Sequence, residues 1–282
     1  MNLENETKYI MKKHNIFAAK RLGQNFLIDE QVVNEIIVAS GVCKEDLVIE
    51  IGPGLGTLTK ALLEKAGKVI CIEIDERMIE ILEDRFSLYD NFEMINDDIL
   101  KVDLAEIIAE NVGMHTKIVA NLPYYITTPI IMKLLEDKLQ LKSITVMVQK
   151  EVANRLTTEP GTGDSGAITY GIRYYTNPQK IVEVPRAYFL PSPEVDSTVI
   201  KLDILREPLV KVTNEKLLFK IIKTAFMQKR KTLLNGLSNS NLFGNKEKIE
   251  KMLLDLRFDL KIRGEKLTLE DFAKISEYIS EN

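Results

Sequence analysis

The sequence predicts an α/β protein built on a mostly parallel sheet with helices on both faces, followed by a small all-helical C-terminal domain. Two patterns carry this prediction. From about residue 29 to residue 156, short apolar runs alternate with amphipathic helical stretches, and this alternation is typical of a parallel sheet that is covered on both sides. From about Thr213 onward, the apolar residues recur only at helical spacing.

In the first part of the chain, residues that typically begin or end a helix mark the boundaries between the expected helices and strands. Asp29 is a suitable N-cap for the first helix, and Gly41 is suited to end it. Gly67 is expected to end the second helix in the same way. The expected strands are residues 46–51, 68–74, 91–96, 117–121 and 143–149, and the expected helices are residues 29–41, 57–67, 75–86, 103–111, 128–138 and 150–156.

The pattern changes after the sixth helix. A loop rich in Gly, Pro, Ser and Thr is expected at 157–166, and residues 167–176 fit either a helix or a strand. Two stretches with period-two alternation, 180–185 and 196–206, predict added antiparallel strands. The helices expected near the C-terminal end are residues 214–226, 246–256 and 268–279.

Composition argues against several classes of protein. The chain has 282 residues, 45% of them apolar, and no apolar run approaches the ~20 residues of a membrane span. The polar N-terminal stretch does not resemble a signal peptide, so we expect a cytoplasmic protein. Two cysteines and two histidines lie scattered without metal-ligand spacing, so no metal is expected. Cys71, inside an apolar run, is expected to be a buried, reduced thiol.

Charge is distributed unevenly between the two predicted domains, which we place at residues 1–205 and 206–282. The net charge of the whole chain is −4, which by itself disfavours a nucleic-acid partner. Residues 201–282, however, contain 17 basic and 12 acidic side chains, a net charge of +5. Because phosphate binding depends on local patches, the C-terminal domain is the better candidate for contact with nucleic acid.

A glycine-rich stretch, EIGPGLG at residues 50–56, lies at an expected strand-to-helix turn. Its glycines permit a sharp turn and a close approach of the backbone to a ligand. The dinucleotide fingerprint G-x-G-x-x-G has its third glycine one position later, and a carboxylate at Glu50 would repel a pyrophosphate. A ligand with an ammonium or sulfonium group suits Gly52, Gly54 and Glu50 better.

Two more acids follow the next two expected strands. Glu73 ends the second strand and can accept hydrogen bonds from ribose hydroxyls. Asp98 follows the third strand and can accept from an adenine amine. Each acid alone fits an ordinary exposed charge at a strand end. Together with Glu50 they stand at the carboxyl ends of successive strands, which favours S-adenosylmethionine as the cofactor.

The stretch NLPYY, residues 121–125, ends the fourth expected strand. An exocyclic amine such as adenine N6 is a poor nucleophile, because its lone pair is delocalised into the ring. The Asn121 side-chain oxygen and the Leu122 carbonyl can accept its N–H groups and favour tetrahedral geometry, while Pro123 stiffens the turn. Tyr124 can stack on the base, whereas for Tyr125 a position in the packed core stays open. The stretch therefore predicts methyl transfer to such an amine.

Eight blocks in this order resemble the small-subunit ribosomal RNA adenine-N6 dimethyltransferases. The blocks are LGQNFL (22–27), EIGPGLGTLT (50–59), IEID (72–75), NDDIL (96–100), NLPYY (121–125), QKEVANRL (149–156), FLPSPEVDS (189–197) and QKRKTLLNGL (228–237). The resemblance implies a Rossmann-like methyltransferase fold. It also implies dimethylation of two adjacent adenosines in the 3′-terminal hairpin of 16S rRNA, within an immature small subunit. We expect the protein to be a monomer.

The resemblance also implies roles for individual residues. Asn25 and Leu27 match contacts to the methionine end of the cofactor. Four further cofactor contacts are matched by Gly52, Glu73, Asp98 and Asn121. Tyr124 and Phe189 match two rings that sandwich the target adenine.

Basic residues follow the first helix of the C-terminal domain. The stretch KTAFMQKRK has no acid, and Lys223, Lys229, Arg230 and Lys231 are its basic side chains. Such a run is often a solvated helix face, but beside a methyl-transfer domain we expect it to contact RNA phosphates, which position an RNA without reading its sequence. A second basic edge is expected from Lys12, Lys13, Lys20 and Arg21.

Three alternatives stay open. A dimethylase of 23S rRNA, of the macrolide-resistance type, shares the fold and the chemistry, but Ile commonly replaces Leu122 in that branch. A methyltransferase of DNA adenine or of glutamine tends to have Pro at that position. A ribosome-assembly factor that binds RNA, with secondary catalysis, would still assemble subunits after Asn121→Ala or Glu73→Ala.

Overall fold

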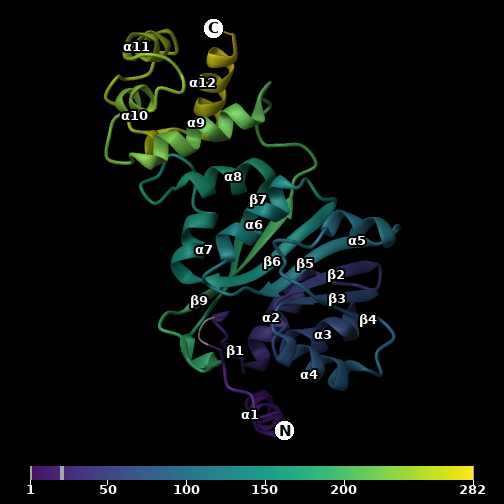
Figure 1. Cartoon of the computed structure of the whole chain (residues 1–282). Helices are drawn as coiled ribbons and strands as arrows, with labels where there is room; N and C mark the ends of the chain where they lie inside the picture. Colours follow the sequence, from purple (N-terminus) through teal and green to yellow (C-terminus); the bar gives the residue numbers. More distant parts are fainter. Residues whose placement is uncertain (1, 20–21, 282) are drawn as a thin grey trace. The chain divides into compact units, whose positions relative to one another are not determined.

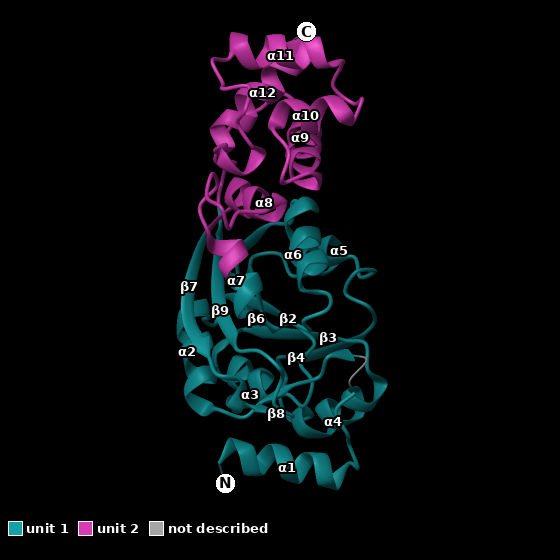
Figure 2. Ribbon diagram, turned by 90° about the vertical axis from the view of Figure 1, so that its left-hand side faces the viewer, with its two compact units in different colours: residues 1–153, 178–204 teal, residues 154–177, 205–282 magenta. Residues whose placement is uncertain are grey.

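A computed structural model describes residues 2–19 and 22–281 (Figure 1). The chain forms two compact units, which Figure 2 shows in different colours. Unit 1 contains Met1–Ala153 and Pro178–Ile204, and unit 2 contains Asn154–Asn177 and Leu205–Asn282. No helix among the described residues is both long and apolar enough to span a membrane.

Unit 1 is organised around a seven-stranded sheet with the order β4-β3-β2-β5-β6-β9-β7. The first five strands in this order are parallel neighbours, and β9 runs antiparallel to β6. The predicted parallel α/β sheet with an antiparallel addition is therefore confirmed. The strands are β2 (Asp46–Ile51), β3 (Lys68–Glu73), β4 (Phe92–Asn96), β5 (His115–Asn121), β6 (Leu141–Gln149), β7 (Thr176–Val184) and β9 (Ser197–Ile204).

Helices cover both faces of the sheet (Figure 1). On one face, Ile36 and Leu62 pack with Val48 in an apolar cluster. The alternate strand residues Ile49 and Ile118 are also fully buried, and α5 and α6 lie on that opposite side in Figure 1. These helices are α2 (Glu30–Ser40), α3 (Thr57–Lys65), α4 (Glu76–Phe86), α5 (Leu104–Glu110), α6 (Thr127–Glu136) and α7 (Lys150–Thr157).

Helix boundaries follow the predicted caps with one difference. The Asp29 side chain accepts from the Val32 N–H, and Gly41 ends α2 in a left-handed conformation. Helix α3, in contrast, ends at Lys65, with the extended Ala66 as its C-cap. Gly67 serves packing instead, because a Cβ there would lie 2.2 Å from the Lys44 carbonyl oxygen.

One α-helix and two short strands of unit 1 were not expected from the sequence, nor was the 3-10 helix Arg186–Tyr188. The N-terminal stretch forms α1 (Leu3–Lys13), which Asn2 caps and which buries Ile10. An ion pair between Arg85 and Glu6, 2.6 Å long, ties α1 to α4. The two short strands are β1 (Phe26–Leu27) and β8 (Phe189–Leu190), which pair antiparallel.

Unit 2 is helical around one apolar core. Its helices are α8 (Ala167–Tyr175), α9 (Glu215–Met227), α10 (Leu233–Asn239), α11 (Lys246–Asp255) and α12 (Leu269–Glu281). The predicted domain of residues 1–205 included 154–177, whereas the structure assigns this segment to unit 2. The reason is aromatic packing: the Tyr170 ring lies 5.1 Å from Phe272, and the Tyr174 ring lies 5.1 Å from Phe219. The ambiguous stretch 167–176 is thus mainly a helix of the second core.

The third glycine of the turn after β2 gives a stability prediction. Gly56 has φ +81°, and a Cβ there would lie 2.6 Å from the buried Phe86 ring. We expect Gly56→Ala to lower the free energy of unfolding by ~2 kcal/mol or more, through strain and overpacking. Gly236→Ala in α10 is the matched control, because that Cβ meets no atom within 4 Å, and it should stabilise the helix by ~0.5–1 kcal/mol. Urea denaturation measures both changes, and equal effects would contradict the packing argument.

Candidate active site

A pocket in unit 1 lies at the carboxyl ends of β2, β3 and β5, where open α/β sheets bind ligands. Its wall is formed by Ile36 of α2 and by residues from four stretches of chain, which lie within 22–27, 50–58, 73–74 and 121–125. The structure brings most of the predicted site residues together there: Asn25, Leu27, Gly52, Gly54, Glu73, Asn121, Leu122 and Tyr124.

The glycine turn shapes one side of the pocket. Gly52 and Gly54 have φ values of +66° and +58°, which other residues rarely adopt. A Cβ at Gly54 would lie 3.2 Å from the Phe26 ring, so the backbone and the ring approach closely there. Gly56 is absent from the pocket wall among the described residues. A glycine is needed at position 56 because the backbone there packs closely against Phe86 of α4.

Glu73 is held in place by backbone donors. Its Oε1 accepts from the N–H groups of Ile74 and Asp75, each at 2.9 Å, and its Oε2 accepts from the Gly54 N–H at 3.3 Å. The residue is 6% exposed, and burial raises its pKa. Oε2 retains acceptor capacity, because a carboxylate oxygen has two lone pairs. Glu73 can therefore receive a ribose hydroxyl without moving.

Glu50 places a second buried acid on the wall. It is 2% exposed, and burial raises its pKa to about 7, with the charge of Glu73 adding to the effect. The thiol of Cys71 donates to Glu50 Oε2 at 3.4 Å, and burial raises the pKa of that thiol. Two buried carboxyl groups beside one pocket fit a cationic ligand, which would favour their ionised forms.

Asn121 has a defined orientation. Its Nδ2 donates to the Asn25 carbonyl oxygen at 3.3 Å, which leaves the amide oxygen to accept. The Leu122 N–H donates to Met147, while among the described residues no donor contacts the Leu122 carbonyl. The next carbonyl, that of Pro123, accepts from Ile126 and Thr127. Two acceptors on the 121–125 stretch, the Asn121 amide oxygen and the Leu122 carbonyl, thus have no donor among the described residues.

The two tyrosines of this stretch differ in environment. The Tyr124 hydroxyl lies 2.7 Å from the hydroxyl of Ser197, which is fully buried at the start of β9. Burial raises the pKa of Tyr124, so its phenol is neutral. Tyr125 is 59% exposed, and a Cβ at Gly23 would lie 3.5 Å from its ring. A core position for Tyr125, which the sequence left open, is therefore wrong.

Sequence comparison assigns the chain to a family. The family model described as ribosomal RNA adenine dimethylase matches residues 16–281. The chain belongs to this family. A ribosomal RNA small subunit methyltransferase A from Lachnoclostridium phytofermentans is 49% identical over 279 residues, which cover 98% of this chain and 96% of the relative. A relative with the same name from Alkaliphilus oremlandii is 46% identical over 272 residues, covering 96% and 95%.

Solved structures support the same assignment. A dimethyladenosine transferase from Plasmodium falciparum superposes with a TM-score of 0.76 at 28% identity, covering 89% of this chain and 95% of the other. A 23S rRNA methyltransferase, ErmE, gives a TM-score of 0.69 at 22% identity, covering 91% and 100%. The ErmE likeness shows a shared fold only. The Rossmann-like methyltransferase fold predicted from the sequence is confirmed.

Two residues matched to the family lie off the wall of the pocket. Phe189 pairs with Leu27 across β1 and β8, and its ring is 2% exposed within the apolar cluster of unit 1. Asp98 follows β4, and its Oδ1 accepts from the Leu100 N–H at 3.0 Å. The structure therefore does not bring Phe189 or Asp98 to the pocket, and their roles toward adenine stay predictions.

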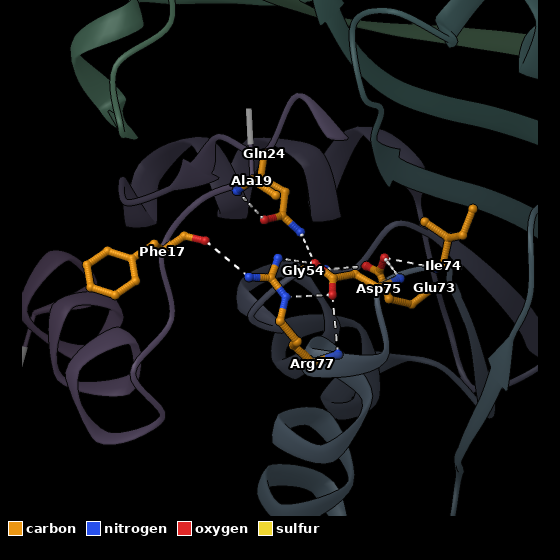
Figure 3. Close-up of polar contacts among 8 residues, drawn as sticks. All are labelled: Phe17, Ala19, Gln24, Gly54, Glu73, Ile74, Asp75 and Arg77. Atoms are coloured by element: carbon orange, nitrogen blue, oxygen red, sulfur yellow. Dashed lines mark hydrogen bonds and ion pairs between the residues drawn. The ribbon is translucent and has the colours of Figure 1, made fainter. Parts of the chain in front are cut away.

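Sequence reasoning about the family motifs missed several residues at the pocket. Ile74, which is 51% exposed, and Gln24 both lie on its wall. Asp75 and Arg77 join Gln24 in the polar network of Figure 3. The blocks LGQNFL and IEID contain three of these residues, but a local pattern does not tell which side chains meet across 51 positions.

The predicted RNA contacts in unit 2 divide into two groups. Lys229 Nζ donates to the carbonyls of Gly163 and Ser165 at 2.8 and 3.3 Å and lies 3.4 Å from Glu265. Its ammonium is therefore used inside the unit. The exposed side chains of Lys223, Arg230 and Lys231 have no acidic partner among the described residues.

Two sets of further basic residues bear on this prediction. The Leu233 N–H donates to the Ile262 carbonyl at 2.7 Å, which places the exposed Lys261 and Arg263 beside the α9–α10 turn. Sequence reasoning missed both. In the second predicted basic edge, Lys13 pairs with Asp84 at 3.0 Å. The remainder of that edge includes Lys20 and Arg21, which lie outside the described residues.

The hydrogen bond between Tyr124 and Ser197 gives a testable prediction. Tyr124→Phe and Ser197→Ala each remove it while keeping the aromatic ring, so each should lower kcat for methyl transfer by roughly 2- to 10-fold. The double variant should be no worse than either single variant, because all three lose the same interaction. Single-turnover methyl incorporation measures this, with Tyr9→Phe on α1 as the control. Multiplicative losses in the double variant would show that the two hydroxyls act separately.

Proposed function

We propose that this protein transfers methyl groups from S-adenosylmethionine to N6 of two adjacent adenosines in the 3′-terminal hairpin of 16S rRNA. The observation that carries the proposal is the geometry of Asn121. Its amide nitrogen is bound to the Asn25 carbonyl at 3.3 Å, so its oxygen and the Leu122 carbonyl form a pair of acceptors beside a pocket with two buried acids.

Cofactor binding is assigned to the residues on the pocket wall. Glu73 has acceptor capacity for ribose hydroxyls, and Gly52 and Gly54 let the backbone approach the ligand. Asn25 and Leu27 are assigned to the methionine end. S-adenosylmethionine, when bound, supplies an electrophilic methyl group on a sulfonium. The two buried acids fit that cation.

Catalysis is assigned to positioning and not to a strong base. Before the first methyl transfer, the Asn121 amide oxygen and the Leu122 carbonyl hold the two N–H groups of adenine N6, and before the second they can hold only the one N–H that is left. Accepting both hydrogen bonds draws the lone pair out of conjugation with the ring and favours the tetrahedral nitrogen of the transition state. Holding the amine in one place also removes the entropic cost of a bimolecular encounter.

The target base must leave its stack to reach these acceptors, as in other enzymes that modify bases. Tyr124 provides the platform, and its neutral phenol is fixed by Ser197. Phe189 is proposed to stack on the opposite face of the target base. Because its ring is 2% exposed, it reaches the base only after turning out of the apolar cluster. Asp98 is proposed to reach the adenine of the cofactor in the same bound state.

The relatives favour one of the alternative substrates. Curated relatives at 46% and 49% identity carry the name of small-subunit methyltransferases, whereas the likeness to ErmE extends to the fold alone. We therefore propose 16S rRNA as the substrate. We further propose, from the sequence and its family resemblance, that the protein acts as a monomer in the cytoplasm on an immature small subunit. A role in subunit assembly is compatible with this activity.

The reaction itself is the first test. Purified protein, labelled cofactor and undermethylated small subunits should yield dimethyladenosine at two neighbouring positions of 16S rRNA. Asn121→Ala should lower the rate by roughly 10²- to 10³-fold, as loss of one transition-state hydrogen bond does elsewhere. Asn239→Ala, an exposed residue at the end of α10, is the control. Full activity of Asn121→Ala, or no label in the 16S rRNA of these subunits, would contradict the proposal.

RNA contact is proposed for Lys223, Arg230 and Lys231 in unit 2. Arg230→Ala and Lys231→Ala should each weaken RNA binding and reduce the salt slope of log K by about one. Lys229→Ala should mainly lower the melting temperature, because its ammonium binds two carbonyls. Lys211→Ala, before the start of α9, is the control. Filter binding at several salt concentrations gives the slopes. Unchanged slopes for Arg230→Ala and Lys231→Ala would contradict the proposed contact with RNA phosphates.

A further inference from the structure

The side-chain amide of Gln24 bridges two segments that are 51 positions apart in the sequence. Its Oε1 accepts from the Ala19 N–H at 2.8 Å, and its Nε2 donates to Asp75 Oδ2 at 2.8 Å (Figure 3). One end of the amide therefore holds the backbone at Ala19, which precedes the segment that lines the pocket. The other end holds the turn between β3 and α4.

Asp75 is a strong and well-placed acceptor. Arg77 donates to both of its carboxylate oxygens, with Nε at 2.9 Å and Nη2 at 2.6 Å. This pairing lowers the pKa of Asp75 below its usual range. The residue is 8% exposed, so its interaction with Gln24 is shielded from water. A hydrogen bond to a buried charge is stronger than one between neutral groups.

Asp75 also contacts the acid that lies on the cofactor side of the pocket. Its N–H donates to Glu73 Oε1 at 2.9 Å, so the turn that holds Gln24 also orients the acid assigned to the ribose (Figure 3). A displacement of Asp75 would move one of the three backbone donors of Glu73.

Gln24 reaches the catalytic side through the next residue. The carbonyl of Asn25 accepts from Asn121 Nδ2 at 3.3 Å. The Asn25 side chain donates to the Gly23 carbonyl at 2.9 Å, which keeps this short segment in one conformation. The segment fixed by Gln24 thus determines which way the amide oxygen of Asn121 points.

We propose that Gln24 is a positioning residue that joins the ribose-binding acid Glu73 to the catalytic amide of Asn121. The connection runs from Glu73 through Asp75 to Gln24, and through the backbone of Asn25 to Asn121. This inference rests on the proposed function for the role of Asn121. Only an amide of this length accepts from Ala19 and donates to Asp75 at once, because a carboxylate would repel Asp75 and an asparagine is one methylene shorter.

The connection from Glu73 to Asn121 can be tested by exchanging the hydrogen-bond donor at position 24 with the acceptor at position 75. Gln24→Glu should weaken S-adenosylmethionine binding by about 10-fold or more and lower kcat at saturating cofactor by a similar factor. Gln24→Glu combined with Asp75→Asn should lose less in both quantities than Gln24→Glu alone, although the new amide nitrogen at position 75 no longer accepts from Arg77 Nη2. In the double variant the carboxylate still accepts from the Ala19 N–H and also accepts from the new amide at position 75, so only the hydrogen bond between positions 24 and 75 has its polarity exchanged.

Three measurements separate positioning from general destabilisation. Calorimetry without RNA gives the cofactor Kd, methyl incorporation gives kcat, and scanning calorimetry gives the melting temperature. Gln140→Glu, an exposed residue before β6 and outside the pocket wall, adds the same charge as the control. Gln24→Met, which has similar length and no added charge, replaces Gln24→Glu if the latter fails to fold, and it should also lower both affinity and kcat.

Several outcomes would overturn the inference. Unchanged Kd and kcat in Gln24→Glu or Gln24→Met would do so, as would losses in the double variant equal to the product of the single ones. If Gln24→Glu weakened cofactor binding but left kcat unchanged, the proposed link from Gln24 to Asn121 would be contradicted. If the unmodified protein bound cofactor without methylating small-subunit RNA, the proposed function would fail, whereas the Kd values would still test the link from Gln24 to Glu73.

Discussion

Parallel pairing of β2, β3 and β5 is the constraint on which the site depends. Ile51 lies opposite Ile72 in the pairing of β2 with β3, and β5 pairs along the other edge of β2. All three strands therefore end at one side of the sheet, and the residues that follow them meet there. Gly52, Glu73 and Asn121 come from stretches far apart in sequence, yet all three reach one pocket because the strands share direction and register.

Buried acids explain much of the local structure around that pocket. Removing a carboxylate from water is costly unless donors replace the lost hydration. Glu73 receives three backbone N–H groups and Asp75 receives a guanidinium and an amide. Glu50 has weaker partners, and its pKa is raised to about 7. The pocket wall thus contains two buried acids, Glu50 and Glu73, whose ionised forms a cationic ligand stabilises. The surrounding hydrogen-bond donors keep this wall rigid.

Long-range side-chain contacts connect this sheet edge to the N-terminal segment. Gln24 meets Asp75 across 51 positions, and Asn25 meets Asn121 across 96 positions. Each contact joins a residue of a short irregular segment to a strand end. The pocket is therefore assembled from a rigid sheet edge and a segment tied to it at two points, which is a common way to orient catalytic groups.

The sequence by itself determined the parallel sheet and both caps of α2, because periodicity and capping are local. It also indicated eight residues of the pocket wall: Asn25 and Leu27 through the family resemblance, and most of the others because the carboxyl ends of parallel strands must meet. Only tertiary structure decided the position of residues 154–177, because the aromatic rings of this segment, such as Tyr170, pack against rings of the helical core. It also decided that Phe189 is covered, that Lys229 binds carbonyls and that Gln24 joins two segments. These depend on contacts between residues distant in sequence, and no local pattern encodes them.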